Sequence, residues 1–233
     1  MKKLTILILM VFGYFSNAVA VEGVNLGASL LYGAFEVDGG KEEFKGQHSG
    51  LGSPGDVSTT TAEDEAEGAF AIGSIFAELQ VNDAIAFGLD YVPQSMETET
   101  TEGVNNQSGS DVTNKVQVDF EELVTLYARI SPPNAMGLYL KAGMLNVDVI
   151  TNENLGTGGA YGNTDLDGYT VALGYNRDLD NDMFVRLEAS YIELDGATLV
   201  NQNDSTKSVT ADGLNGYGAR TVSYTHLTLP TMF

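Results

Sequence analysis

The sequence contains no cysteine, few basic residues and few histidines. Its 233 residues include no Cys, 2 His, and 11 Lys and Arg against 32 Asp and Glu. Without cysteine the chain forms no disulfide and offers no Cys/His metal cluster. A formal net charge of −21 repels nucleic acid and attracts cations, so no nucleic-acid partner is expected.

Long apolar runs are also scarce, and the one that is present lies at the N-terminus. Lys2 and Lys3 precede an apolar stretch over residues 4–15, and Ala18-Val19-Ala20 has the small residues of a cleavage site. The stretch is shorter than the roughly 20 apolar residues of a spanning helix. We therefore predict residues 1–20 to be an export signal peptide. Without them, 9 Lys and Arg remain against 32 acids, a net charge near −23.

Residues 123–149 are typical of a β-hairpin. The runs LVTLYARI and MGLYLKAGMLNVDV flank the short turn SPPNA, and polarity alternates along both runs. Alternate residues of a strand point to opposite faces of the sheet, so one face is apolar and the other polar. The apolar face contains Val124, Leu126, Ala128, Ile130, Leu138, Leu140, Ala142 and Met144.

The same alternation recurs along the chain and predicts eight strands. They span residues 24–37, 67–81, 85–96, 115–130, 136–150, 166–177 and 183–195, with the eighth starting near Ser208. Connections after odd strands are long and polar, and the first two are rich in acids, whereas those after even strands are short. Long loops on one side and short turns on the other are typical of outer-membrane barrels. We therefore predict an all-β protein, an eight-stranded antiparallel up-and-down transmembrane β-barrel, over residues 21–221.

Matching apolar positions across each short turn predicts the strand register. Leu79 then faces Phe87, Leu126 faces Leu140, and Leu173 faces Leu187. In this arrangement the apolar parity faces lipid and the polar parity faces the lumen. The predicted lipid-facing residues are Leu126, Leu138, Leu140, Leu173, Val185 and Leu187.

The polar parity predicts a charged lumen. Charges of both signs enclosed in a narrow interior must pair, because an isolated buried charge costs several kcal/mol. The predicted lumen charge network contains Glu78, Asp90, Glu121, Arg129, Lys141, Arg186, Glu188 and Arg220. Tyrosines at the outer strand ends predict an interfacial aromatic girdle made of Tyr32, Tyr91, Tyr169, Tyr175, Tyr191 and Tyr217. Alternation alone also fits the inverse arrangement, a soluble exported lipocalin-like barrel with an apolar core.

Candidate catalytic and metal-binding residues are few. His48 lies with Ser49, Ser53 and Asp56 in one Gly-rich loop, where nothing positions a base against a nucleophile. We therefore expect no enzymatic activity, no cofactor and no structural metal. The acid runs at residues 63–65 and 178–182 lack EF-hand spacing, and predict at most weak divalent-cation binding at the surface.

The end of the chain departs from the rest. The run VSYTHLTLP, from Val222 to Pro230, resembles one reading frame of the transposase adapter used in sequencing libraries. We predict residues 222–233 to be a non-native tail that completes or replaces part of the eighth strand. In that case His226 is not a native residue, and Phe233 is not a barrel-assembly signal.

The signal peptide, the eight alternating strands, the long acidic loops and the charged lumen together resemble small outer-membrane barrels of the OmpA transmembrane-domain and OmpW type. The resemblance covers the chain to about Thr221 and transfers no site residues. It implies a monomer in the bacterial outer membrane, in contact with outer-membrane lipid and lipopolysaccharide. The implied function is non-enzymatic: a structural barrel, or a narrow channel for small molecules. The alternative is the soluble ligand-binding barrel.

Overall fold

The structure is a computed structural model that describes residues 23–37, 39–45, 57–62, 66–107, 110–156, 158–179 and 183–228. These residues form fourteen β-strands in two sheets. They include no helix with the length and hydropathy of a membrane span. The predicted signal peptide, the loop candidates around His48 and the acid run at residues 63–65 lie outside the described residues.

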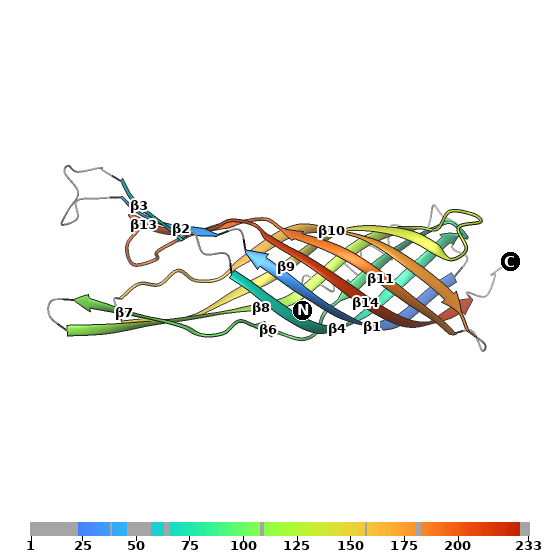
Figure 1. Cartoon of the computed structure of the whole chain (residues 1–233), viewed down its shortest axis with the longest axis horizontal. Coiled ribbons are helices and arrows are strands. Elements are labelled where there is room, and N and C mark those ends of the chain that lie inside the picture. The colour runs from blue at the N-terminus through green and yellow to red at the C-terminus, as the bar shows by residue number, and fades with distance from the viewer. Residues whose placement is uncertain are drawn as a thin grey trace.

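Eight of the strands close into one antiparallel barrel (Figure 1). Each barrel strand pairs with the barrel strands before and after it in the sequence, and the first pairs with the last. The barrel wall therefore has no unpaired edge strand. The predicted fold class is confirmed. The barrel strands are β1 (Gly23–Val37), β4 (Ala66–Asn82), β5 (Ile85–Tyr91), β8 (Ser110–Ile130), β9 (Leu138–Leu155), β10 (Thr164–Asp178), β11 (Met183–Leu194) and β14 (Leu214–Thr228).

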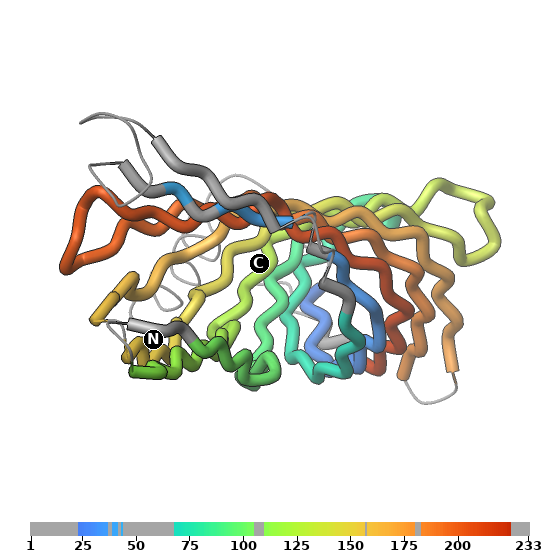
Figure 2. Tube along the Cα trace, turned by 60° about the vertical axis from the view of Figure 1, so that its left-hand side comes forward, coloured from blue at the N-terminus to red at the C-terminus, as the bar shows by residue number. Residues whose placement is uncertain are grey.

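The two ends of the barrel differ. At one end, called the turn end here, short connections join β4 to β5, β8 to β9 and β10 to β11. The Asn82 side chain closes the first of these turns by accepting hydrogen bonds from the backbone N–H groups of Ala84 and Ile85, both at 2.9 Å. The other end, called the loop end, carries the long connections, as Figure 2 also shows.

Two long connections predicted as loops contain a second sheet. The sheet has the order β12-β13-β2-β3 and lies at the loop end, beyond the barrel (Figure 1). The third, between β5 and β8, contains two strands that pair with the outer part of β8. These strands are β2 (Gly40–Lys45), β3 (Val57–Ala62), β6 (Met96–Glu97), β7 (Thr101–Gln107), β12 (Ala197–Val200) and β13 (Lys207–Ala211).

Several strand boundaries differ from the prediction: β8 begins at Ser110 and β9 ends at Leu155, each five residues beyond the expected bound, and two further differences change the architecture. The strand expected over residues 85–96 ends at Tyr91, because the chain leaves the ladder there, near a bulge in the neighbouring β8 between Glu121 and Val124. The strand expected to begin near Ser208 is two strands. Residues 207–211 form β13 of the second sheet, and the barrel strand begins at Leu214.

The predicted register holds for one hairpin and shifts in the other two. Leu79 lies opposite Phe87 as predicted. Leu126 lies opposite Met144 rather than Leu140, and Leu173 opposite Ala189 rather than Leu187. The turns are longer than assumed, and the β8–β9 turn places Asn134 and Met136 at positive φ, 67° and 52°. Both shifts are even, so each side chain stays on its predicted face.

The predicted tail continues the barrel wall. Residues 222–228 extend β14 and pair with β1 over residues 23–29, and residues 222–225 pair with β11 on the other side. Val222 and Tyr224 point inward and are buried. The alternation of polarity therefore persists across Thr221, and the non-native origin of these residues stays a prediction.

Deleting residues 222–233 should prevent barrel closure, because residues 23–29 of β1 would lose every partner on the β14 side. We expect the truncated chain to show no heat-modifiable band on a cold gel after refolding into lipid vesicles. Deleting residues 229–233 alone, which follow β14, should leave that band in place. A folded band from the longer deletion would contradict the assigned closure.

Candidate functional site: the charged barrel interior

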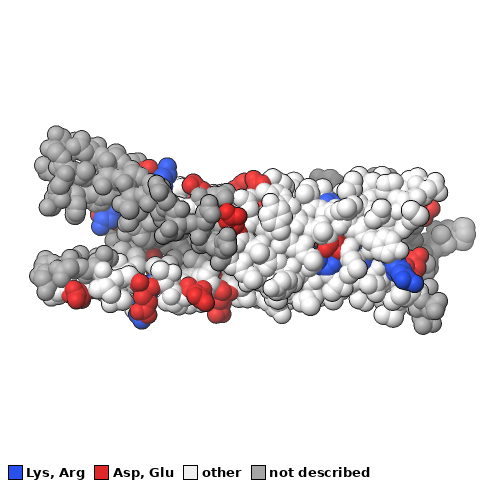
Figure 3. Space-filling model, viewed as in Figure 1, with Lys and Arg blue, Asp and Glu red and all other residues white. Residues whose placement is uncertain are grey.

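The outer face of the barrel wall is apolar. Leu126, Leu138, Leu140, Leu173 and Leu187 are between 39% and 60% exposed, and Val185 on the same face is partly exposed. In Figure 3 the visible face carries a largely uncharged band over the barrel and acidic residues towards the loop end. Apolar side chains thus cover the surface where a soluble protein would place polar ones.

Glu78 of β4 is the centre of the interior. Its side chain has no exposed surface, and its carboxylate accepts hydrogen bonds from two guanidinium groups. The Arg186 Nη2 and Nη1 atoms lie 2.9 and 3.0 Å from Oε1 and Oε2, and the Arg129 Nη2 lies 3.0 Å from Oε1. Asn25 Nδ2 donates at 2.9 Å, and Tyr127 Oη at 3.2 Å. One carboxylate therefore joins β1, β4, β8 and β11 across the interior.

A second group of charges lies beside it. Glu188 of β11 accepts from the Tyr139 hydroxyl at 2.7 Å and from Lys141 Nζ at 3.3 Å. The Nε atom of Arg220, on β14, lies 3.8 Å from Glu188 Oε2. The Nη1 atom of the same side chain donates to Asp90 Oδ2 at 2.7 Å. Asp90 also accepts from the Ser74 hydroxyl at 3.0 Å, which extends the network to β4. Seven of the eight residues predicted for the lumen network are thus brought together.

Glu121 does not join this network. The bulge in β8 shifts the register by one residue between Glu121 and Val124, which reverses the alternation of faces beyond it. Glu121 lies opposite Asp148, whose neighbours Val147 and Val149 are buried inside. It therefore belongs to the outer face, and its assignment to the lumen was wrong. Nothing in the alternating pattern marked the bulge.

Two interior tyrosines were missed as site residues. Tyr127 and Tyr139 are buried, and each ring lies over a glycine of the adjacent strand, Gly88 and Gly174. A Cβ atom on either glycine would be 2.2 Å from the ring. The rings also contact cations: Lys141 Nζ lies 4.3 Å from the centroid of Tyr127. Glycine at these two positions makes room for the rings.

Apolar clusters fill the interior beside the charges and towards the loop end. Towards the loop end, two clusters fill the interior, with Leu31, Ile72 and Val92 in one and Leu145, Val147 and Leu194 in the other. Beside the charges, Phe76, Val222 and Tyr224 pack together with Phe184; Phe76 is two residues from Glu78 on β4, and Val222 lies opposite Arg186. The Phe184 and Tyr224 rings stack with centroids 4.7 Å apart. Apolar side chains therefore fill interior space beside the charges and on their loop-end side, where water would otherwise solvate them.

Tyrosines and acids mark the border of the apolar band. On the outer face, Tyr169, Tyr191 and Tyr217 form a row on adjacent strands, with ring centroids 6.3 and 5.1 Å apart. The hydroxyls of Tyr169 and Tyr191 both donate to Glu193. Tyr32 and Tyr175 are exposed on the same outer face, and Tyr91 is partly exposed. This is the arrangement expected of a membrane-interface girdle.

The acids at the loop end lie at the surface. Glu102 pairs with Lys115, and Asp204 lies 3.5 Å from Lys207 Nζ, both at the surface. Hydrogen bonds from the Thr206 hydroxyl and backbone N–H hold the pKa of Asp204 below its ordinary value. Within the described ranges, no three His, Asp or Glu side chains are arranged to hold a metal ion. Divalent-cation binding by these loops stays a prediction.

A closed antiparallel barrel with an apolar outer face and a charged, internally paired interior is the architecture of a transmembrane β-barrel of the outer-membrane type. The inverse arrangement, a soluble barrel with an apolar core, is contradicted. Leu140 and Leu173 are more than half exposed, whereas Glu78, Arg186 and Glu188 are at most 5% exposed.

No family model matches the chain, and no curated protein matches its sequence. Among solved structures, the chain is similar to the outer membrane protein OprG from Pseudomonas aeruginosa, with a TM-score of 0.46, 12% identity, and coverage of 89% of this chain and 100% of OprG. Neisserial surface protein A gives a TM-score of 0.41 at 12% identity, covering 88% and 99%. The outer membrane protease OmpT from Escherichia coli gives 0.41 at 12%, covering 90% and 99%.

Replacing Glu78 by Gln should strongly destabilise the barrel, because Arg129 and Arg186 would then be buried beside a neutral amide. We expect the free energy of unfolding to fall by about 3–5 kcal/mol. Urea titration of the refolded barrel in lipid vesicles, followed by the heat-modifiable band, measures it. Glu102→Gln, which removes an exposed pair with Lys115, should change it by less than about 1 kcal/mol. Equal effects of the two substitutions would show that the interior pairing adds little.

Proposed function

We propose that this chain is a non-enzymatic outer-membrane barrel whose filled interior makes it a structural unit that displays acidic β-structure at the cell surface. The observation that carries this proposal is the interior network. Four cations and three anions are enclosed and paired there, next to apolar clusters. Among the described residues, no buried side-chain N or O atom lacks a hydrogen-bond partner. Such an interior supports mechanical stability rather than passage of solutes.

The narrow-channel form of the function is less well supported. An eight-stranded barrel has an interior just wide enough for its own side chains. Here Tyr127 and Tyr139 enter that space from adjacent strands, and both hydroxyls are held by carboxylates, Glu78 and Glu188. A solute would have to separate these groups from one another. We therefore propose a lumen that is closed at rest.

The unequal lengths of the connections at the two barrel ends support an orientation of the barrel in the membrane. Barrels of this class place short turns in the periplasm and long loops outside the cell. The loop end would then present β7 and the four-stranded β12-β13-β2-β3 sheet to the exterior. The apolar band would contact outer-membrane lipid, and the border of tyrosines would lie at the level of the lipopolysaccharide head groups. We propose the barrel as a monomer, since its sheet closes within one chain.

The absence of enzymatic activity is part of the proposal. The outer membrane protease OmpT shows that a similar barrel can be an enzyme. In this chain the buried charges, such as Glu78 and Arg186, lie inside the barrel and form ion pairs with one another. Acids at the loop end, such as Glu102 and Asp204, have basic partners at the surface. Neither set supplies a base held against a nucleophile.

The refolded wild-type barrel should show no stepwise conductance in a planar lipid bilayer, because its paired charges and apolar clusters fill the lumen. An open porin inserted in the same bilayer serves as the positive control. A gel shift on heating confirms that the sample is folded before measurement. Regular, ohmic steps in the wild-type recordings would overturn the closed lumen and favour the channel.

Leu173→Arg should distinguish a barrel in lipid from one in water. Leu173 is 55% exposed, so in water an arginine there would be nearly neutral for stability. In a bilayer, arginine at mid-depth of a barrel costs about 2–4 kcal/mol. We expect a loss of that size in vesicles. Asn152→Arg, on the exposed part of β9 beyond the apolar band, provides the control with little change. No difference between them would contradict the membrane location.

A further inference from the structure

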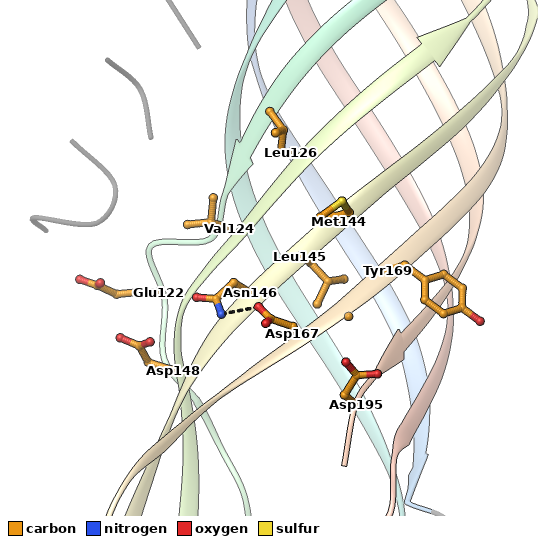
Figure 4. A pocket seen from close by; sticks show the side chains of 11 residues that line it. Glu122, Val124, Leu126, Met144, Leu145, Asn146, Asp148, Asp167, Tyr169 and Asp195 are labelled. Atoms are coloured by element: carbon orange, nitrogen blue, oxygen red, sulfur yellow. Dashed lines mark hydrogen bonds between the residues drawn. The ribbon is translucent and has the colours of Figure 1, made fainter. Parts of the chain in front are cut away.

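A groove on the outside of the barrel lies where the apolar band meets the acidic border (Figure 4). It has a volume of about 550 Å³ and crosses the outer faces of β8, β9 and β10. Leu126 and Met144, which face each other across β8 and β9, form its floor towards the turn end. Met144 is 73% exposed, so the floor is open to whatever surrounds the barrel.

The opposite side of the groove is acidic. Glu122, Asp148, Asp167 and Asp195 line it, and no Lys or Arg does. The backbone fixes their places: the Asp195 N–H donates to the Asp167 carbonyl at 2.8 Å. Asn146 Nδ2 donates to the Asp167 carboxylate at 2.8 Å, drawn as the dashed line in Figure 4. The bulge that reverses β8 brings Glu122, at φ 52°, to this rim.

The arrangement fits one kind of occupant. The acids are spread around the rim rather than gathered, and no three of them are arranged to hold a metal ion among the described residues. A phosphate or sulfate head group would meet four carboxylates and no basic side chain. An apolar floor that continues into the lipid-facing surface suits an alkyl chain, and a rim of several carboxylates suits a positive charge at its end.

We propose that this groove binds a single-chain amphiphile with a cationic head group, such as a long-chain amine. The chain lies along Leu126 and Met144, and the ammonium group lies between Asp148, Asp167 and Asp195. The site is on the outer wall and needs no opening of the lumen. It goes beyond the proposed structural role, and requires only that the wall faces lipid.

The chain has no tryptophan, so one introduced indole reports on a single place. Met144→Trp puts it on the groove floor. Leu30→Trp is the matched control, because Leu30 is exposed on β1, four strands from β9 in either direction around the barrel. Both variants are refolded into phosphatidylcholine vesicles and shown to be heat-modifiable. Fluorescence quenching is then titrated with chain-brominated hexadecylamine, and with the matching hexadecyl sulfate and hexadecyl maltoside.

We expect the amine to quench Trp at position 144 at a mole fraction roughly five-fold lower than the maltoside does, and the three probes to act alike at position 30. Adding Asp167→Asn and Asp195→Asn should abolish the difference. Removing two charges elsewhere, with Asp83→Asn and Asp212→Asn, should preserve it.

Several outcomes would overturn the proposal. Equal quenching by all three probes at position 144 would show ordinary lipid contact. Amine-selective quenching at both positions would show general attraction to an acidic protein. Sulfate-selective quenching that needs Mg²⁺ would show a bridged anionic lipid instead. If no probe quenches either tryptophan, the wall does not face lipid, and the membrane assignment fails rather than the groove alone.

Discussion

Charges enclosed in a narrow, water-poor interior must find partners there, and the rest of the barrel is arranged around that requirement. Glu78 meets it by accepting from Arg129 and Arg186, which come from strands on different sides of the wall. Asp90 and Glu188 meet it through Arg220 and Lys141. These partners are separated by up to 130 residues in sequence. They therefore hold the wall in one cross-section, which backbone hydrogen bonds between adjacent strands alone do not specify.

The barrel can stay this narrow because large and small residues lie opposite each other on adjacent strands. The Tyr127 ring occupies the space left by Gly88, and the Tyr139 ring the space left by Gly174. Because each large ring faces a residue with no side chain, two tyrosines and seven charged side chains fit inside eight strands. Cations also contact the faces of these rings: Lys141 lies over Tyr127 at 4.3 Å, and Arg129 and Arg186 each lie 5.6 Å from the centroid of Tyr139. Size complementarity and charge compensation are thus properties of the same few positions.

Much of this could be predicted, for a specific reason. Side chains alternate with a period of two, so the faces of Leu140, Lys141 and Arg186 follow from polarity even where the register is wrong by two or four residues. A register shift of one residue, by contrast, moves every following side chain to the opposite face, so polarity no longer predicts the face. Glu121 was placed inside because the bulge beside it leaves no mark in the alternation. The second sheet at the loop end was missed because its strands are short and polar. The partners of Glu78 depend on contacts across the interior, which no local pattern encodes.

The pairing of β1 with β14 joins the beginning of the described chain to its end, from Gly23 to Thr228. Until the last strand is available, the other seven can form only an open sheet with two unpaired edges and an apolar face exposed to water. The chain therefore cannot complete its fold while it is still being made. Between synthesis and closure the chain exposes those edges and that face, so this is the interval in which it is most prone to aggregate.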